Sequence, residues 1–225
     1  MSIDVQQGIA ASKLLKTIEG DPACREAVRA LLSACTNDRI EEATLIACVE
    51  PVLREAGELP VQPISSVIEM LVRHGALAET LEIDGTPYAG SIEDAYADVS
   101  IPDEAESLIY EQTTDVGAIV IRALAPQSRA AALFESEPDC IEGFLATLEA
   151  CDTQAGISTK ALELVLDERG LLLRDAATGI PTVYPSMFAN MLKDAGCLEW
   201  NHAWITTETG REALNAFASC GHEAR

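Results

Sequence analysis

The spacing of apolar residues divides the first third of the chain into three helices. Apolar positions recur at helical intervals over residues 22–35, over residues 40–56 and over residues 64–74. Gly57 and Gly75 follow the second and third stretches, at positions where glycine commonly ends a helix. We therefore predict three consecutive helices that each bury one face.

A strand pattern follows the third helix. Residues 76–83 alternate apolar and polar side chains, as a half-buried strand does. A hairpin turn is predicted at Asp84 and Gly85, directly after this strand. Residues 86–100 are predicted to form an extended connector. A further helix is predicted to begin at Pro102, with an apolar stripe that includes Leu108, Ile109, Val116, Ile119, Val120 and Leu124.

The same pattern occurs twice in the chain. Residues 22–35 align without a gap with residues 138–151, and the proline, both cysteines, a glutamate, a leucine and two alanines coincide. Residues 70–77 also align with residues 191–198. The alternative is that alanine-rich helices resemble one another by chance, but proline, cysteine and glycine recur at matching places. We infer an internal repeat.

The second copy has clearly marked ends. Helices are predicted over residues 138–151, 158–169 and 185–194, and a two-stranded wing over residues 197–206 has its turn at Asn201 and His202. Three helices closed by a hairpin is the plan of the winged helix.

The segment that leaves the second wing strengthens this interpretation. Residues 205–214, Ile-Thr-Thr-Glu-Thr-Gly-Arg-Glu-Ala-Leu, resemble the corresponding segment of many bacterial and archaeal regulators of the winged helix-turn-helix superfamily. Thr207 or Thr206 can cap the next helix, independently of the resemblance. The resemblance implies a mainly α (α+β) protein with two winged-helix-like units. Their expected limits are an N-terminal helix over 1–20, units over 21–90 and 126–225, and an acidic connector with a linker helix over 91–125.

In that superfamily the third helix and the wing make the contacts with DNA. The resemblance therefore implies a recognition surface, for DNA or for a protein partner, at positions that face away from the core. These positions are Ser65, Ser66, Glu69, Arg73, Ser186, Asn190 and Lys193 on the third helices, and Asp84, Gly85, Asn201 and His202 on the wings.

The charge of the chain argues against DNA as the first partner. The formal net charge is -22, and residues 74–121 contain no Lys or Arg. Affinity for a nucleic-acid backbone comes from cations that displace counterions, so this chain begins with long-range repulsion. The acidic stretch has three readings: a solvated face, a docking surface, or a mimic of nucleic acid. The acidity could also be a property of a whole proteome adapted to salt.

Side chains suited to catalysis are sparse. Of the three histidines, His74 falls at a helix end, His202 in a turn and His222 near the end of the sequence. The seven cysteines form no Cys-x-x-Cys pair, and Cys24 and Cys35 are better read as small core residues than as zinc ligands. We predict no catalytic site, no metal site and no cofactor.

The favoured function is therefore a noncatalytic interaction or regulatory module that binds another protein. The alternative is a winged-helix transcriptional regulator that binds DNA as a dimer and so doubles its few basic contacts. The apolar stripe of residues 9–18 could support a homodimer, or pack within the chain. No apolar run is long enough to span a membrane, and the N-terminus lacks the features of a signal peptide, so a cytoplasmic protein is expected.

Overall fold

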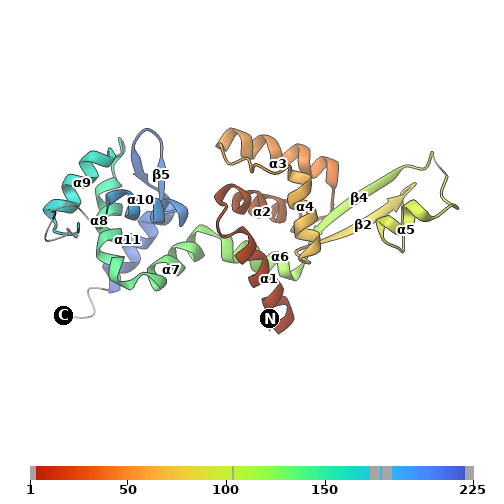
Figure 1. Cartoon of the computed structure of the whole chain (residues 1–225), viewed down its shortest axis with the longest axis horizontal. Coiled ribbons are helices and arrows are strands. Elements are labelled where there is room, and N and C mark those ends of the chain that lie inside the picture. The colour runs from red at the N-terminus through yellow and green to blue at the C-terminus, as the bar shows by residue number, and fades with distance from the viewer. Residues whose placement is uncertain (1–3, 103, 173–177, 179–183, 221–225) are drawn as a thin grey trace. The chain divides into compact units, whose positions relative to one another are not determined.

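A computed structural model describes residues 4–102, 104–172, 178 and 184–220. The protein is mainly helical, with two small antiparallel sheets. The chain divides into two compact units, residues 1–124 (unit 1) and residues 125–225 (unit 2), each with its own hydrophobic core. Figure 1 shows the helices and strands along the chain.

Unit 1 begins with four helices. They are α1 (Val5–Ile18), α2 (Pro22–Ala34), α3 (Glu42–Ala56) and α4 (Ile64–Arg73). Asp21 caps α2 through a hydrogen bond from the Cys24 backbone N–H, and Pro22 occupies the first turn, where its missing N–H costs nothing. The predicted helix ends are confirmed at Gly57 and Gly75, which both adopt positive φ.

The core of unit 1 lies between these helices and α6 (Asp115–Leu124). Leu14, Leu32 and Leu71 are fully buried from three different helices. Cys24 and Cys35 belong to the same core, as the sequence predicts. The apolar stripe of residues 9–18 therefore packs within the chain: Ala11, Leu14 and Ile18 are all buried.

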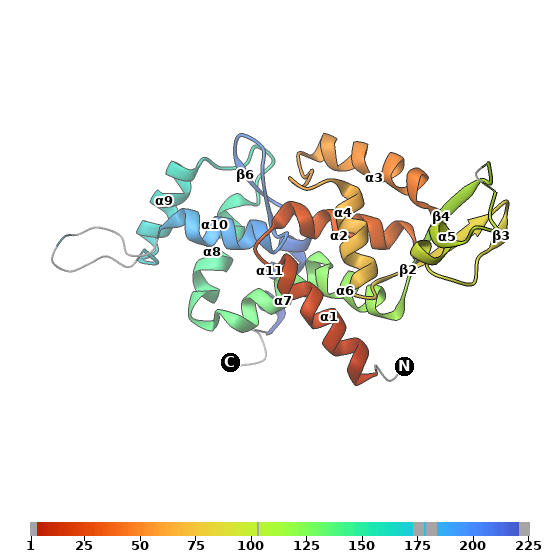
Figure 2. The ribbon, with the colours of Figure 1, turned by 45° about the vertical axis from the view of Figure 1, so that its right-hand side comes forward.

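The strands of unit 1 form a four-stranded sheet in the order β1-β4-β2-β3. Strand β2 (Leu77–Ile83) pairs over its whole length with β4 (Ser107–Thr113), from Leu77 opposite Thr113 to Ile83 opposite Ser107. The short strands β1 (Ile40–Glu41) and β3 (Thr86–Pro87) extend the two edges. Figures 1 and 2 both show β2 and β4 running outward from the helices of unit 1, with α5 (Ile92–Ala97) alongside.

Two predictions for this region are wrong. The helix expected from Pro102 is instead β4 over residues 107–113, and the helix begins only at Asp115. The connector expected over 86–100 contains β3 and α5, and α5 has a capping box between Ser91 and Asp94. Leu108 and Ile109 belong to opposite faces of a strand that is partly covered on both sides, so they mimic the start of a helical stripe.

Unit 2 repeats the plan with shorter strands. Its helices are α7 (Pro126–Ser136), α8 (Ile141–Cys151), α9 (Thr159–Glu168), α10 (Pro185–Asp194) and α11 (Glu208–Cys220), with a 3₁₀ turn, η1 (Pro138–Cys140), before α8. Strands β5 (Leu198–Trp200) and β6 (Trp204–Thr206) form a hairpin between α10 and α11. Its turn includes His202 at positive φ, in agreement with the predicted turn.

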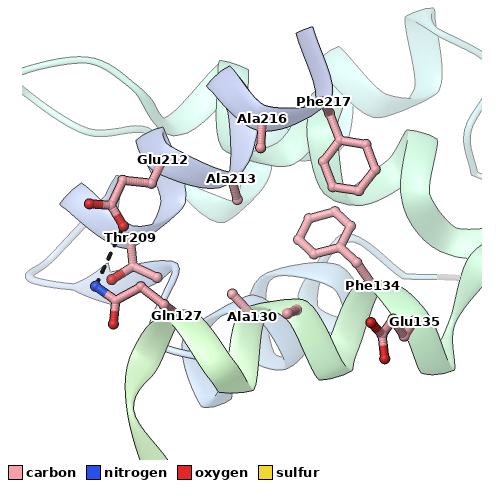
Figure 3. A pocket seen from close by; sticks show the side chains of 10 residues that line it. Gln127, Ala130, Phe134, Glu135, Thr209, Glu212, Ala213, Ala216 and Phe217 are labelled. Atoms are coloured by element: carbon pink, nitrogen blue, oxygen red, sulfur yellow. Dashed lines mark hydrogen bonds between the residues drawn. The ribbon is translucent and has the colours of Figure 1, made fainter. Parts of the chain in front are cut away.

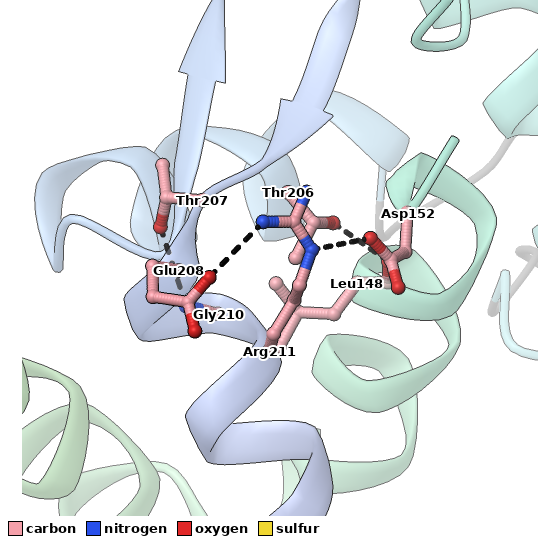
Figure 4. Close-up of polar contacts among 7 residues, drawn as sticks. All are labelled: Leu148, Asp152, Thr206, Thr207, Glu208, Gly210 and Arg211. Carbon is pink, nitrogen blue, oxygen red and sulfur yellow. Dashed lines mark hydrogen bonds and ion pairs between the residues drawn. The ribbon is translucent and has the colours of Figure 1, made fainter. Parts of the chain in front are cut away.

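The junction between the last strand and the last helix is the same in both units. In unit 2, Thr206 Oγ1 donates to the Leu148 carbonyl (2.7 Å), Thr207 Oγ1 donates to the Gly196 carbonyl (2.7 Å), and the Gly210 N–H donates to Thr207 Oγ1 (3.2 Å) (Figure 4). Thr207 is thus the predicted cap of α11.

In unit 1, Thr113 donates to the Leu32 carbonyl (2.6 Å), Thr114 donates to the Gly75 carbonyl (2.6 Å), and the Gly117 N–H donates to Thr114 (3.2 Å). Leu32 and Leu148, and likewise Gly75 and Gly196, are equivalent in the sequence alignment. When the two units are aligned at these contacts, α1 of unit 1 is equivalent to α7 of unit 2, and α6 is equivalent to α11.

Candidate functional site

The helix positions expected to contact a partner are at the surface to different degrees. On α4, Glu69 and Arg73 are exposed, whereas Ser65 and Ser66 are half-buried. On α10, the exposed positions are Ser186, Asn190 and Lys193. Both helices therefore present polar side chains outward, with a single Lys or Arg among the expected contact positions of each.

The two hairpin turns differ in what surrounds them. Asp84 and Gly85 are exposed at the end of the seven-residue strand β2, where Asp84 Oδ1 accepts a hydrogen bond from the Glu106 N–H (3.0 Å). Asn201 and His202 are exposed between strands of three residues. Since α4 leads into the first residue of β2, the turn of Asp84 and Gly85 lies at the end of β2 away from α4.

Arg73 lines a surface hollow together with two other basic residues. Lys13 of α1 and His74 line this hollow together with Arg73, beside Gln6, Ile9 and Ala10. One turn before Arg73, Glu69 lies close enough to Glu42 to contribute, after burial, to raising the pKa of that carboxyl. The expected recognition helix of unit 1 therefore carries a carboxyl near its middle and basic residues near its C-terminal end.

The most strongly charged feature of unit 1 is its projecting sheet. We call residues 77–113 the acidic arm, since they comprise β2, β3, α5 and β4 and include no Lys or Arg. A cation from outside the arm reaches it: Arg39 Nη1 lies 2.6 Å from Glu82 Oε1, and the Arg39 guanidinium lies 4.6 Å from the centre of the Tyr110 ring. This pairing covers part of one face of the arm.

The other face of the arm contains an open groove of about 500 Å³ that is lined mainly by apolar residues, together with Asp98 and Ser107. Leu81, Ile83 and Ile109 form its floor on the strands, and α5 with the following loop forms its wall. Tyr96 and Val99 line the groove and are 86% and 102% exposed, so their apolar surfaces are open to solvent. Large exposed apolar residues that gather around a groove are a mark of an interaction site.

A buried carboxyl lies nearer the base of the arm, on the same face of the sheet. Glu111 of β4 has no exposed surface, and neither of its carboxyl oxygens has a hydrogen-bond partner among the described residues. Glu79 lies directly opposite on β2, and Glu42 begins α3. Burial, followed by the Glu79 and Glu42 charges, raises the pKa of Glu111 to about 8.

The matching positions of unit 2 hold a different set of side chains. Trp204 pairs with Trp200 and with Ile157, just as Glu111 pairs with Glu79 and Ile40. The two tryptophan rings lie edge to face with centroids 4.9 Å apart, and Trp204 Nε1 donates to Thr159 Oγ1 (3.0 Å). Thr159 aligns with Glu42. An aromatic pair with a hydroxyl thus corresponds to three carboxyls in unit 1.

Three buried cysteines are poorly suited to nucleophilic chemistry. Burial raises the pKa of Cys151 to about 12, and burial is also the main cause that raises the pKa of Cys35 and of Cys197 to about 11. A thiol must lose its proton to attack or to bind a metal, so these three are poor nucleophiles at neutral pH. Within the described ranges, no three His, Cys, Asp or Glu side chains are grouped to hold a metal ion. The third histidine, His222, lies outside the described residues.

Comparison with known proteins gives no relative: no family model, no curated protein and no solved structure matches the chain. Among the described helices, none combines the length and the apolar character needed to cross a membrane. Any functional proposal therefore depends on the residues of the two units themselves.

Proposed function

We propose that this chain is a noncatalytic interaction module built from two winged-helix units, and that its acidic arm binds a basic, amphipathic segment of a partner protein. The observation that carries the proposal is the combination of the open apolar groove with a surrounding segment that includes no Lys or Arg. An apolar side chain of the partner fills the groove, while its lysines or arginines meet the carboxylates around it.

The winged-helix assignment is supported by the order of elements in each unit. Three helices are followed by paired antiparallel strands and by a capped helix, and the threonine–glycine junction is shared. The hairpins depart from a DNA-binding wing because Glu79, Glu82 and Asp84 stand on the first and Glu199 on the second. Acidic hairpins favour a protein partner over a nucleic acid.

A synthetic amphipathic peptide of leucine and lysine tests the proposal by fluorescence anisotropy on the full chain. We expect the peptide to bind more tightly than its scrambled sequence, which has the same charge and no apolar face. The substitutions Glu104→Lys/Glu106→Lys should weaken binding by roughly tenfold, because both side chains are exposed on the arm. Tyr96→Glu/Val99→Glu should weaken it through the groove instead.

The control Glu163→Lys/Glu168→Lys makes the same change in net charge on α9 of unit 2, outside the residues of the arm. Equal weakening by the control and by the arm variants would mean that the peptide responds to total charge, and the arm would not be the site. Equal affinity for the scrambled peptide would remove the role of the groove.

DNA binding is a second candidate because Arg73, Lys13 and His74 share one hollow. A labelled random duplex, titrated at low and rising salt, distinguishes the two functions. Binding that falls steeply with salt and is weakened by Arg73→Glu/Lys193→Glu would make DNA the partner. We expect the arm variants to have no such effect on the duplex.

A further inference from the structure

Unit 2 has a pocket of about 420 Å³ between its first and last helices, α7 and α11. Small-molecule sites are typically roughly 300–1,000 Å³. Ala130, Ala213 and Ala216 form the apolar wall, and Phe134 and Phe217 lie together at one end, with ring centroids 4.8 Å apart (Figure 3). The pocket is therefore large enough for a compact ligand with an apolar body.

Unit 1 fills the equivalent space with its own side chains. When the units are matched at Pro22/Pro138 and at Gly117/Gly210, Leu14 corresponds to Ala130 and Val120 corresponds to Ala213. Leu14 and Val120 are both fully buried. The two smaller side chains of unit 2 therefore leave open, between α7 and α11, the space that Leu14 and Val120 fill in unit 1.

The end of the pocket opposite the phenylalanines is polar. Thr209 and Glu212 stand where unit 1 has Val116 and Ile119, and Gln127 lies beside them (Figure 3). Thr209 is only 9% exposed, yet its hydroxyl makes no hydrogen bond to another described residue. Glu212 Oε2 accepts one long hydrogen bond from Gln127 Nε2 (3.4 Å). The Thr209 hydroxyl can therefore take a ligand in the pocket as its hydrogen-bond partner.

The charged side chains that line the pocket favour a positively charged ligand. Glu212 at the polar end and Glu135 beside Phe134 are carboxylates, and none of the described residues that line the pocket is Lys, Arg or His. We propose that this pocket binds a small organic amine. Its protonated nitrogen donates hydrogen bonds to the Glu212 carboxylate and the Thr209 hydroxyl, and its apolar body lies against the alanines and the two phenylalanine rings.

Three phenylalkyl compounds that differ in one group test the proposal, with calorimetric titration of the full chain at physiological salt. They are 4-phenylbutylamine, the neutral 4-phenylbutanol and the anionic 4-phenylbutyrate. We expect the amine to bind at least roughly tenfold more tightly than the alcohol, because a hydrogen bond to a charged group is stronger than a neutral one, and the butyrate to bind least.

Two variants test the polar end and the apolar wall of the pocket one at a time. Glu212→Gln should abolish the preference for the amine over the alcohol, whereas the control Glu163→Gln on α9 should leave it unchanged. Ala130→Leu/Ala213→Val places the unit 1 side chains in unit 2; it should raise the melting temperature and abolish binding of all three compounds.

Several results would overturn the proposal. They are equal affinity for amine and alcohol, tighter binding of the butyrate, a preference that survives Glu212→Gln, or no binding of the amine to the folded wild-type chain. Undiminished amine binding to the filled variant, with that variant folded by circular dichroism, would place the amine elsewhere. The site is in unit 2 and independent of the acidic arm, so failure of either proposal leaves the other standing.

Discussion

At the scale of single residues, the two units place very different side chains, Trp204 and Glu111, at the same position of the hairpin. Trp204 satisfies its buried N–H through Thr159, whereas Glu111, at the same place in the sheet, has two buried oxygens without a described partner. A buried carboxyl of this kind is held in its neutral form, since burial penalises the charge. Glu111 therefore couples the stability of unit 1 to pH.

The sign of this coupling follows from the two states. The pKa of Glu111 is about 8 in the folded chain and close to that of an ordinary glutamate in the unfolded chain, so the folded state binds more protons between these values. We expect the free energy of unfolding to fall as pH rises from about 5 to about 8. Glu111→Gln should flatten this dependence in urea titrations at several pH values.

Glu163→Gln is the matched control for that measurement, because Glu163 is exposed on α9. The pH dependence of its unfolding should equal that of the wild type. Burial and neighbouring carboxylates also raise the pKa of Glu42 and of Glu79, so part of the slope should remain in Glu111→Gln. An unchanged slope in Glu111→Gln would contradict the assignment of the coupling to this residue.

Gly117 and Gly210 are required because another backbone segment lies too close for a Cβ atom, and not because φ is positive. A Cβ atom at Gly210 would overlap the Cys197 carbonyl oxygen, and one at Gly117 would overlap the Ala76 carbonyl oxygen. Gly210→Ala should therefore lower the free energy of unfolding by about 1–3 kcal/mol, measured by urea denaturation. Gly20→Ala, where the added Cβ has open space, should change it little; similar losses at both glycines would count against the packing explanation.

At the scale of elements, the acidic arm is an insertion into a hairpin. Unit 2 joins β5 to β6 through three residues, whereas unit 1 places β3 and α5 between β2 and β4. Replacing residues 84–106 with Asn-Gly should leave β2 paired with β4, since the seven pairs of this ladder lie outside the deletion.

The deletion should keep the helical circular dichroism signal of unit 1 almost intact and remove binding of the leucine–lysine peptide. Loss of the helical signal would show that the arm is part of the core of unit 1. Retained peptide binding by the folded variant would place the peptide on another surface.

The sequence allowed prediction of the helices because their signals are local. The apolar spacing lies within each helix, and the glycines at 57 and 75 follow directly after two of them. The pairing of β2 with β4 was missed because the partners are far apart in the chain, and because Leu108 and Ile109 interrupt the alternation. The buried state of Glu111 was also missed: a glutamate in a half-buried strand is usually exposed, and its burial depends on β1, β2 and α3 together.

The expected surface residues were predictable as exposed or half-buried polar positions, but not as a site. No local pattern indicates that Arg73 lies beside Lys13 of α1, or that Tyr96 and Val99 border a groove. The pocket of unit 2 had a signal that could have been found: Ala130 and Ala213 stand where the repeat has leucine and valine.

At the scale of the whole molecule, the two hydrophobic cores share no residue. The cluster of unit 1 ends at Leu124, and the cluster of unit 2 begins at Ala130. We expect the fragments 1–124 and 125–225 to fold separately, each with a cooperative unfolding transition in calorimetry. If either fragment lacks a transition that the full chain shows, the units depend on each other for stability.

The threonine–glycine junction also limits where the two units can differ. The same contacts hold the last helix in place in both units, so the side chains on the hairpin and between the outer helices can change without opening that junction. Unit 1 has filled outer helices and a hairpin with buried carboxyls, whereas unit 2 has an aromatic hairpin and a pocket between its outer helices.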